Sequence, residues 1–211
     1  MRHPEAFADL ERALREGPVP RSIGLDRSPR GERHAAVLML FTDDADPELT
    51  FVTRAETLRK HPGQMALPGG RVEPGDTTRA HTALREANEE IGLVADAVSV
   101  LGELPPLWVP ASRFDVTTVL GVWEGGTPLE PVDPAETGAV HCYRVSDLAS
   151  EAVRVTASHP TGFLSPAFVF GDQFIWGLTA HLVDWVLELG GWARPWDADR
   201  IVEIPARYLR D

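Results

Sequence analysis

The chain has 211 residues and a formal net charge of −12, with 43% hydrophobic and 25% charged residues. This composition is ordinary for a globular protein and predicts a single domain. The acidic balance disfavours nucleic acid or an anionic membrane as a partner, but an anionic small molecule can still bind at a local basic pocket or a bound cation.

The first predicted elements are a helix and a strand pair. Residues 4–17 have the spacing of a short amphipathic helix that ends at Gly17, and a loop containing Pro, Gly and Arg follows over 18–33. The apolar run 34–41 and the run 49–55 are predicted to be strands. A turn rich in Asp joins them, so we expect them to pair antiparallel.

The next segment, 56–76, is rich in glycine and proline and shows little periodicity, which predicts a loop. Ordered loops of this length inside a domain usually serve function. A helix is predicted from Asp76 to Gly92. Asp76 or Thr77 can cap its start, and Gly92 suits the left-handed residue that follows a helix.

The remaining elements mix strands and helices. They are strands at 97–109, 114–123 and 136–145, a short helix at 146–152, a hairpin at 166–176 and a last helix at 177–192. Helices at the start, middle and end of a chain that is otherwise built of strands predict an α/β sandwich in one domain.

The chain has a single cysteine, Cys142, so no intrachain disulfide can form, which fits a reducing compartment. We expect Cys142 to be a small side chain of the core. The N-terminal residues lack the apolar stretch of a signal peptide, and no run of about 18 apolar residues indicates a membrane span. The sequence therefore predicts a cytoplasmic protein.

Three carboxylates are concentrated in the stretch TALREANEEIG, at Glu86, Glu89 and Glu90. On a helix they fall within an arc of roughly 100°, beside an apolar stripe that includes Ala83 and Ala87. Crowded like charges disfavour a helix, whereas a divalent cation such as Mg²⁺ prefers carboxylate oxygens and reverses the sign of this effect. The helix can thus pack on a sheet while its glutamates line a cleft.

An isolated acidic face of this kind is more often solvated than functional. The segment before the helix favours function here, because LPGGRVEPGD is a glycine-rich turn that lets a ligand approach the backbone. Arg59, Lys60 and Arg71 lie in the same region of an acidic protein. Cations, carboxylates and exposed backbone together suit phosphate chemistry with bridging metal ions.

Residues 69–93, GGRVEPGDTTRAHTALREANEEIGL, resemble the Nudix box. The second half of that pattern is matched in full, from Arg85 through Glu86, Glu89 and Glu90 to the glycine and leucine that follow. The first half differs in two ways: Asp76 stands where Glu is usual, and eight residues rather than seven separate it from Arg85.

A second motif, TRAETLRKHPGQMALPGGRVE, is similar to the signature of the coenzyme A pyrophosphatase branch of this family. The matching residues are Arg54, Ala55, Arg59, Gly63, Pro68, Gly69 and Gly70. Leu67 replaces the usual Phe, Val52 replaces a frequent Thr, and Glu73 replaces the usual Asp. The resemblance covers roughly residues 34–192.

The resemblance implies a Nudix-type α/β/α sandwich with a mixed sheet over residues 34–192. The N-terminal helix and extended loop, 1–33, would precede this domain, and a C-terminal tail, 193–211, would follow it. It also implies hydrolysis of the diphosphate linkage of coenzyme A or a thio-derivative, dependent on Mg²⁺ or Mn²⁺. The products would be adenosine 3′,5′-bisphosphate and 4′-phosphopantetheine. A homodimer is compatible with the family.

The site residues follow from the same resemblance. Glu86, Glu89 and Glu90 are the expected metal ligands and catalytic residues, and Asp76 with Arg85 is expected to pin the loop to the helix. The expected substrate contacts are Arg54, Arg59, Gly63, Gly70 and Arg71. The general base is left open between Glu86, Glu89 and a downstream acid such as Glu136.

Two other functions stay open at this stage. One is a Nudix hydrolase of another nucleoside diphosphate derivative such as ADP-ribose, against which the branch motif argues. The other is a non-catalytic Nudix-fold ligand sensor, although such proteins commonly lose glutamates of the box and this chain keeps all three.

Overall fold

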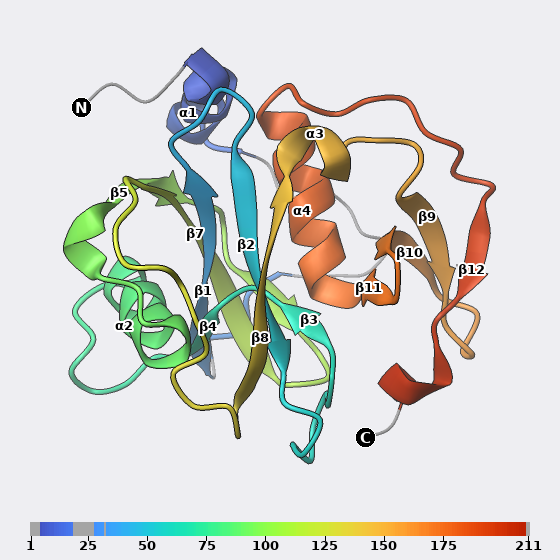
Figure 1. The fold of residues 1–211 in the computed structure, drawn as a ribbon, viewed down its shortest axis with the longest axis horizontal. Helices are drawn as coiled ribbons and strands as arrows, with labels where there is room; N and C mark the ends of the chain where they lie inside the picture. Colours follow the sequence, from blue (N-terminus) through green and yellow to red (C-terminus); the bar gives the residue numbers. More distant parts are fainter. Residues whose placement is uncertain (1–4, 19–27, 32, 210–211) are drawn as a thin grey trace.

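The computed structural model describes residues 5–18, 28–31 and 33–209, and its centre is a mixed β-sheet packed between helices (Figure 1). The α-helices are α1 (Ala8–Glu16), α2 (Arg79–Ile91), α3 (Val145–Leu148) and α4 (Gly177–Leu189), with 3₁₀ turns at Glu5–Phe7, Ala95–Ala97 and Ala206–Leu209. Among the described residues, no helix combines the length and apolar character that crossing a membrane requires.

The strands form two sheets. The larger sheet contains β1 (His34–Thr42), β2 (Glu48–Arg54), β3 (Met65–Ala66), β4 (Gly69–Arg71), β5 (Val98–Glu103), β6 (Leu107–Val109), β7 (Phe114–Trp123) and β8 (Thr137–Arg144). The smaller sheet contains β9 (Arg154–Ser158), β10 (Leu164–Phe170), β11 (Gln173–Ile175) and β12 (Ile201–Glu203).

Strand β1 is the axis of the larger sheet. It runs parallel to β7 along its whole length, from His34 opposite Asp115 to Thr42 opposite Trp123. Its other edge pairs antiparallel with β2 and with β4, so the expected antiparallel pairing of the first two strands is confirmed. Because β4 borders β1, the glycine-rich segment before α2 is held beside the centre of the sheet.

The alternation of side chains along β1 creates the layers. Successive strand residues point to opposite faces, so Ala36 and Leu38 pack on α2, whereas Met39 and Phe41 pack in the core shared with α1 and α4. Helix α2 therefore covers one face, and α1 and α4 cover the other. The predicted α/β/α sandwich with a mixed sheet is confirmed.

The smaller sheet lies beside α4, where Figure 1 shows it in orange to red. The predicted hairpin is confirmed as β10 and β11. Strands β9 and β12 were not predicted, and β12 brings the C-terminal segment back to pair in parallel with β9. A buried ion pair between Arg154 of β9 and Asp184 joins this sheet to α4.

Several local predictions were wrong in detail. The run 97–109 forms two strands, β5 and β6, because the consecutive prolines between them cannot donate to a sheet ladder. The predicted loop 56–76 contains β3 and β4. Cys142 is exposed rather than in the core, because β8 pairs with β2 alone and forms an edge of the sheet. Most of the predicted loop 18–33 lies outside the described residues.

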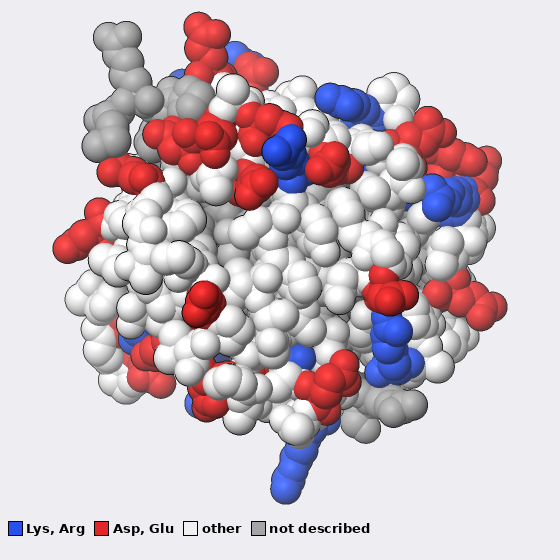
Figure 2. Space-filling view, viewed as in Figure 1, with Lys and Arg blue, Asp and Glu red and all other residues white. Residues whose placement is uncertain are grey.

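The acidic surplus is unevenly distributed over the face in Figure 2. Among the described residues, acidic side chains gather along the upper edge of this view, and charged groups are sparse across its centre. An anionic ligand therefore depends on local arginines or a bound cation rather than on the overall field of the protein.

Candidate active site

Helix α2 carries the acidic cluster and is fixed at both ends. Its N-cap is Thr78, whose hydroxyl accepts the backbone N–H of His81 at 3.0 Å, rather than the predicted Asp76 or Thr77. Asp76 cannot serve as the cap because its carboxylate is engaged by Arg85 and Thr82. Gly92 takes the predicted left-handed conformation at the C-terminus, with φ of 70°.

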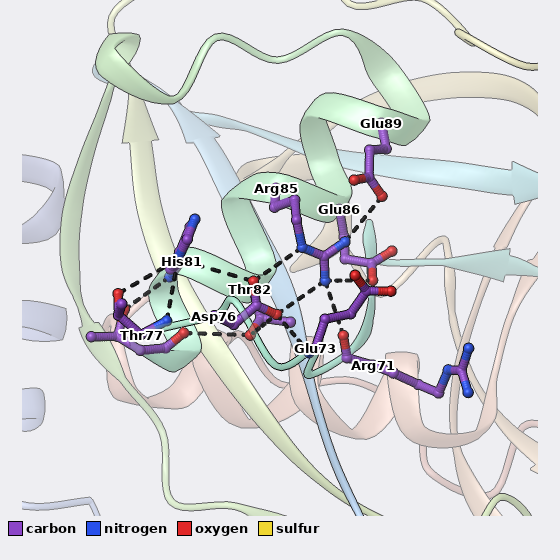
Figure 3. A network of polar contacts seen from close by, with 10 residues as sticks. Arg71, Glu73, Asp76, Thr77, His81, Thr82, Arg85, Glu86 and Glu89 are labelled. Atoms are coloured by element: carbon purple, nitrogen blue, oxygen red, sulfur yellow. Dashed lines mark hydrogen bonds and ion pairs between the residues drawn. The ribbon is translucent and has the colours of Figure 1, made fainter.

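Arg85 lies at the centre of the polar network in Figure 3. Its Nε and Nη2 atoms donate to the two carboxylate oxygens of Asp76, each at 3.1 Å, and Nη2 also donates to the carbonyl of Arg71 at 3.0 Å. The Nη1 atom donates to Glu89 at 3.0 Å. Arg85 thus attaches the segment from β4 to Asp76 onto α2, with the two-pronged geometry that suits a guanidinium and a carboxylate.

The Asp76 side chain is only 2% exposed, so it needs these partners. It accepts the Thr82 hydroxyl at 2.9 Å and the backbone N–H of Glu73 at 2.9 Å in addition to the guanidinium. The hydrogen bonds from Arg85, followed by the backbone hydrogen bond at Glu73, hold the pKa of Asp76 well below its usual range. Asp76 is therefore an ionised anchor for Arg85.

Glu86 and Glu90 lie one helical turn apart and face the glycines of β4. The Glu90 carboxylate accepts the backbone N–H of Gly69 at 3.0 Å. The Glu86 carboxylate lies so close to Gly70 that a Cβ added there would fall 2.3 Å from its carboxyl carbon. A side chain at Gly70 would displace Glu86, so the second glycine allows the carboxylate to reach the backbone of β4.

The pKa values of both carboxylates are raised, so their ionised forms are disfavoured. Burial raises the pKa of Glu90 to about 7, and the charges of Glu86 and Glu136 add to the rise, while the Gly69 N–H and Arg54 oppose it. Burial also raises the pKa of Glu86, against the opposing effect of Arg85. Two acidic groups that resist ionisation in the same place favour a positive charge between them.

A hard divalent cation fits this donor set, because carboxylate oxygens are the ligands that such ions prefer. Glu86 and Glu90 are the residues placed to hold it. Glu89 is 57% exposed and its carboxylate is paired with Arg85. Within the described residues, no three acidic, histidine or cysteine side chains converge as a ready-made metal centre. Arg85 bonds Glu86 as well as Glu89, each at 3.0 Å, so exposure is what separates the two. The arrangement therefore brings two of the three predicted ligands, Glu86 and Glu90, against β4 and leaves Glu89 toward solvent.

The predicted substrate contacts lie at different distances from this cluster. Arg54 lines a cavity of about 280 Å³ together with Glu90 and Gly69, and its Nε atom is buried with no hydrogen-bond partner among the described residues. Arg59 and Arg71 are exposed, and Figure 3 shows the Arg71 side chain extending away from the Arg85 network. Arg54 is thus the predicted arginine that the fold brings to the acidic cluster.

Two other predicted residues flank the site. Gly63 has φ of 66°, and a Cβ there would fall 2.4 Å from a carboxylate oxygen of Glu56, so it supports the turn that follows Arg54. Its N–H donates to the Arg54 carbonyl at 3.1 Å. Glu136 is exposed at the start of β8, and its charge contributes to the raised pKa of Glu90.

The sequence did not identify the opposite wall of this cavity. Ser112, from the turn after β6, and Leu178, Thr179 and Leu182, from α4, lie across from the glycine-rich segment. They are far from the box in the sequence, and although they lie within the region that resembles the family, the sequence analysis assigned none of them to the site. The one available signal was His61 in RKHPG, which lines the cavity and has a positive φ of 56°.

The sequence is similar to those of known proteins. A family model described as the NUDIX domain matches residues 32–161. The protein named Nudix hydrolase NudL from Yersinia pestis (strain Pestoides F) is 36% identical over 153 residues, which cover 72% of this chain and 76% of the relative. The matched family region contains β1, β2, β4 and α2, the elements that hold the glutamates and Arg54.

A solved structure of a Nudix hydrolase from Alicyclobacillus acidocaldarius is 21% identical in sequence. The alignment covers 77% of this chain and 93% of that chain, with a TM-score of 0.47. The crystal structure of the Nudix hydrolase RenU from M. smegmatis is also 21% identical. Its alignment covers 55% of this chain and 73% of that chain, with a TM-score of 0.46.

Replacing Arg85 with alanine is expected to lower the free energy of unfolding by about 3 kcal/mol, because it leaves the buried Asp76 charge without its main partner. Arg79→Ala on the same helix should change it by less than about 0.5 kcal/mol. Adding Asp76→Asn to the Arg85 variant should recover part of the loss. Urea denaturation followed by circular dichroism measures the free energy of unfolding of each variant. Equal losses of stability in Arg85→Ala and Arg79→Ala would contradict the role of Arg85.

Glu90→Gln is expected to change how stability depends on pH in the presence of EDTA. The folded-state pKa of Glu90 is about 7, above the model-peptide value of about 4.3. The folded chain therefore keeps a proton that the unfolded chain has lost. The free energy of unfolding of the parent protein should fall, relative to the variant, as pH rises from about 4 to about 7, and the difference should then level off. Denaturant titrations across this range test it, and parallel curves would rule it out.

Proposed function

Because the chain belongs to the Nudix family, we propose that it is a Mg²⁺- or Mn²⁺-dependent hydrolase of the diphosphate linkage in coenzyme A or its derivatives. The products are adenosine 3′,5′-bisphosphate and 4′-phosphopantetheine. The observation that carries this proposal is the position of the segment resembling the coenzyme A branch. Its residues Arg54, His61 and Gly69 form the wall of the cavity that contains Glu90.

Arg54 is the residue placed to bind the diphosphate. Its buried Nε needs an acceptor, and a phosphate oxygen in the cavity supplies one. The opposing effect of Arg54 on the pKa of Glu90 places its charge near the carboxylate cluster. A phosphate between Arg54 and the cation held at Glu90 would meet positive charge from two sides.

The acidic residues have two proposed roles, which are to hold the cation and to accept a proton from the attacking water. Glu86 and Glu90 hold the divalent cation, which when bound neutralises phosphate charge and makes water more acidic. The candidates for the group that accepts the proton from the attacking water are Glu86, Glu89 and Glu136. Glu89 and Glu136 are both exposed, and Glu89 shares its charge with Arg85. A water placed by any of them would attack one phosphorus of the bound diphosphate.

The substrate is tested by comparing kcat/KM for coenzyme A and ADP-ribose with Mg²⁺ and with Mn²⁺. Coenzyme A is expected to be the better substrate, and preference for ADP-ribose would overturn the assignment. Glu90→Gln should lower kcat/KM at least about a hundredfold, because a lost cation ligand removes charge stabilisation in the transition state. The control variant is Glu103→Gln. It should retain activity, because Glu103 on β5 is exposed and lies far from the acidic cluster in the sequence.

A parent protein that binds coenzyme A without metal and hydrolyses neither compound would identify a ligand sensor instead. Product identification distinguishes the mode of cleavage. Adenosine 3′,5′-bisphosphate and 4′-phosphopantetheine in equal amounts indicate attack on the diphosphate, whereas release of inorganic phosphate indicates a different reaction.

A further inference from the structure

The backbone of Arg54 is held by the end of the loop that follows it. Its N–H donates to the carbonyl of Gln64 at 3.0 Å, and its carbonyl accepts the N–H of Gly63 at 3.1 Å. The pairing of β2 with β8 is irregular at the same point, because the register shifts between Thr53 and Arg54. An irregularity of this kind re-aims a side chain. The direction of the Arg54 side chain therefore depends on where residues 63 and 64 lie.

The side chain of Gln64 reaches the C-terminal segment. Its Nε2 atom donates to the backbone carbonyl of Tyr208 at 2.8 Å, across 144 positions of the sequence. Gln64 also lines a second cavity of about 670 Å³, which shares Arg54 and His61 with the cavity that contains Glu90. The hydrogen bond thus joins the wall of the site to the end of the chain.

Tyr208 is itself anchored in the smaller sheet. Its side chain is 4% exposed and packs in a cluster that includes Ile204 and Phe174, and the ring centroids of Phe174 and Tyr208 lie 6.4 Å apart with planes inclined by 21°. The N–H of Ile204 donates to the carbonyl of Ser158 at 3.1 Å, directly after β12 has paired with β9. The Tyr208 carbonyl is therefore a fixed acceptor, which can set the position of Gln64.

A second interaction joins the same two segments. Arg207 donates from Nη2 to the Tyr208 hydroxyl at 3.1 Å. This hydrogen bond is the largest of the effects that raise the pKa of Arg207, and the charge of Glu56 in the loop after β2 adds to the rise. The Glu56 carboxylate packs on Gly63, where an added Cβ would fall 2.4 Å from one of its oxygens. The loop after β2 thus interacts with the C-terminal turn near its start as well as at its end.

We propose that Gln64 is a positioning residue, held by the Tyr208 carbonyl so that Arg54 faces the acidic cluster, and that the turn Ala206–Leu209 is part of the active site. The inference rests on the proposed function, in which Arg54 binds the diphosphate. The C-terminal turn acts on the substrate through Gln64 and Arg54 and does not touch it. A segment predicted to be a tail thereby supports the phosphate-binding wall.

The test is the kinetics of Gln64→Met, which nearly keeps the length and volume of the side chain but cannot donate to the Tyr208 carbonyl. KM for coenzyme A is expected to rise at least about fivefold while kcat changes less than about twofold, because Arg54 binds the diphosphate in the ground state and the transition state alike. A variant that only lost stability would lower the active fraction, and with it the apparent kcat, and would leave KM unchanged.

Gln173→Met in β11 is the matched control. Gln173 is the other glutamine of the chain and lines neither cavity, so this variant should keep the KM of the parent. Tyr208→Ala should raise KM as Gln64→Met does, because loss of the buried ring releases the carbonyl. The double variant should be no worse than either single variant, since both changes remove the same hydrogen bond. An unchanged KM in Gln64→Met, or multiplied effects in the double variant, would overturn the positioning role.

The positioning role is tested whichever diphosphate the parent hydrolyses. Turnover of ADP-ribose and not coenzyme A would overturn the proposed substrate, and KM would then be compared with ADP-ribose, which also contains a diphosphate. Binding of coenzyme A without hydrolysis would overturn the proposed activity, and its dissociation constant would take the place of KM. Binding of neither compound would overturn both proposals.

Discussion

The ion pair between Arg85 and Asp76 connects the two halves of the site. One half is the glycine-rich segment that ends in β4, and the other is the acidic face of α2. The guanidinium also bonds the carbonyl of Arg71 and the carboxylates of Glu86 and Glu89, so a single side chain fixes both the backbone of β4 and two carboxylates of α2. Because Asp76 is almost fully buried, the pair is costly to break, and α2 cannot move relative to β4 without breaking it.

The close contact between β4 and α2 depends equally on two glycines. A Cβ at Gly69 would fall 2.4 Å from the carbonyl oxygen of Ala36 in β1, and one at Gly70 would collide with Glu86. The strand is therefore enclosed between β1 on one side and the carboxylates on the other. This confinement buries Glu86 and Glu90 enough to raise their pKa values, so the backbone packing produces the electrostatic character of the site.

The opposite side of the site comes from the second half of the chain. α4 and the turn after β6 close the cavity across from Arg54, and Phe163, just before β10, and Trp176, between β11 and α4, line the larger cavity beside it. The result is a space with a charged end and an apolar end.

The sequence by itself determined the sandwich, the helix over the box and the grouping of its glutamates. Spacing of three and four residues places side chains on one helical face in any context, and Gly92 can end a helix without help from distant residues. Tertiary structure decided the rest. It placed Arg54 rather than Arg59 or Arg71 beside Glu90, and the helix cap fell to Thr78 because Asp76 was already engaged by Arg85. The position of Arg54 depends on contacts between segments far apart in the chain, and local spacing carries no information about which of several arginines makes such a contact.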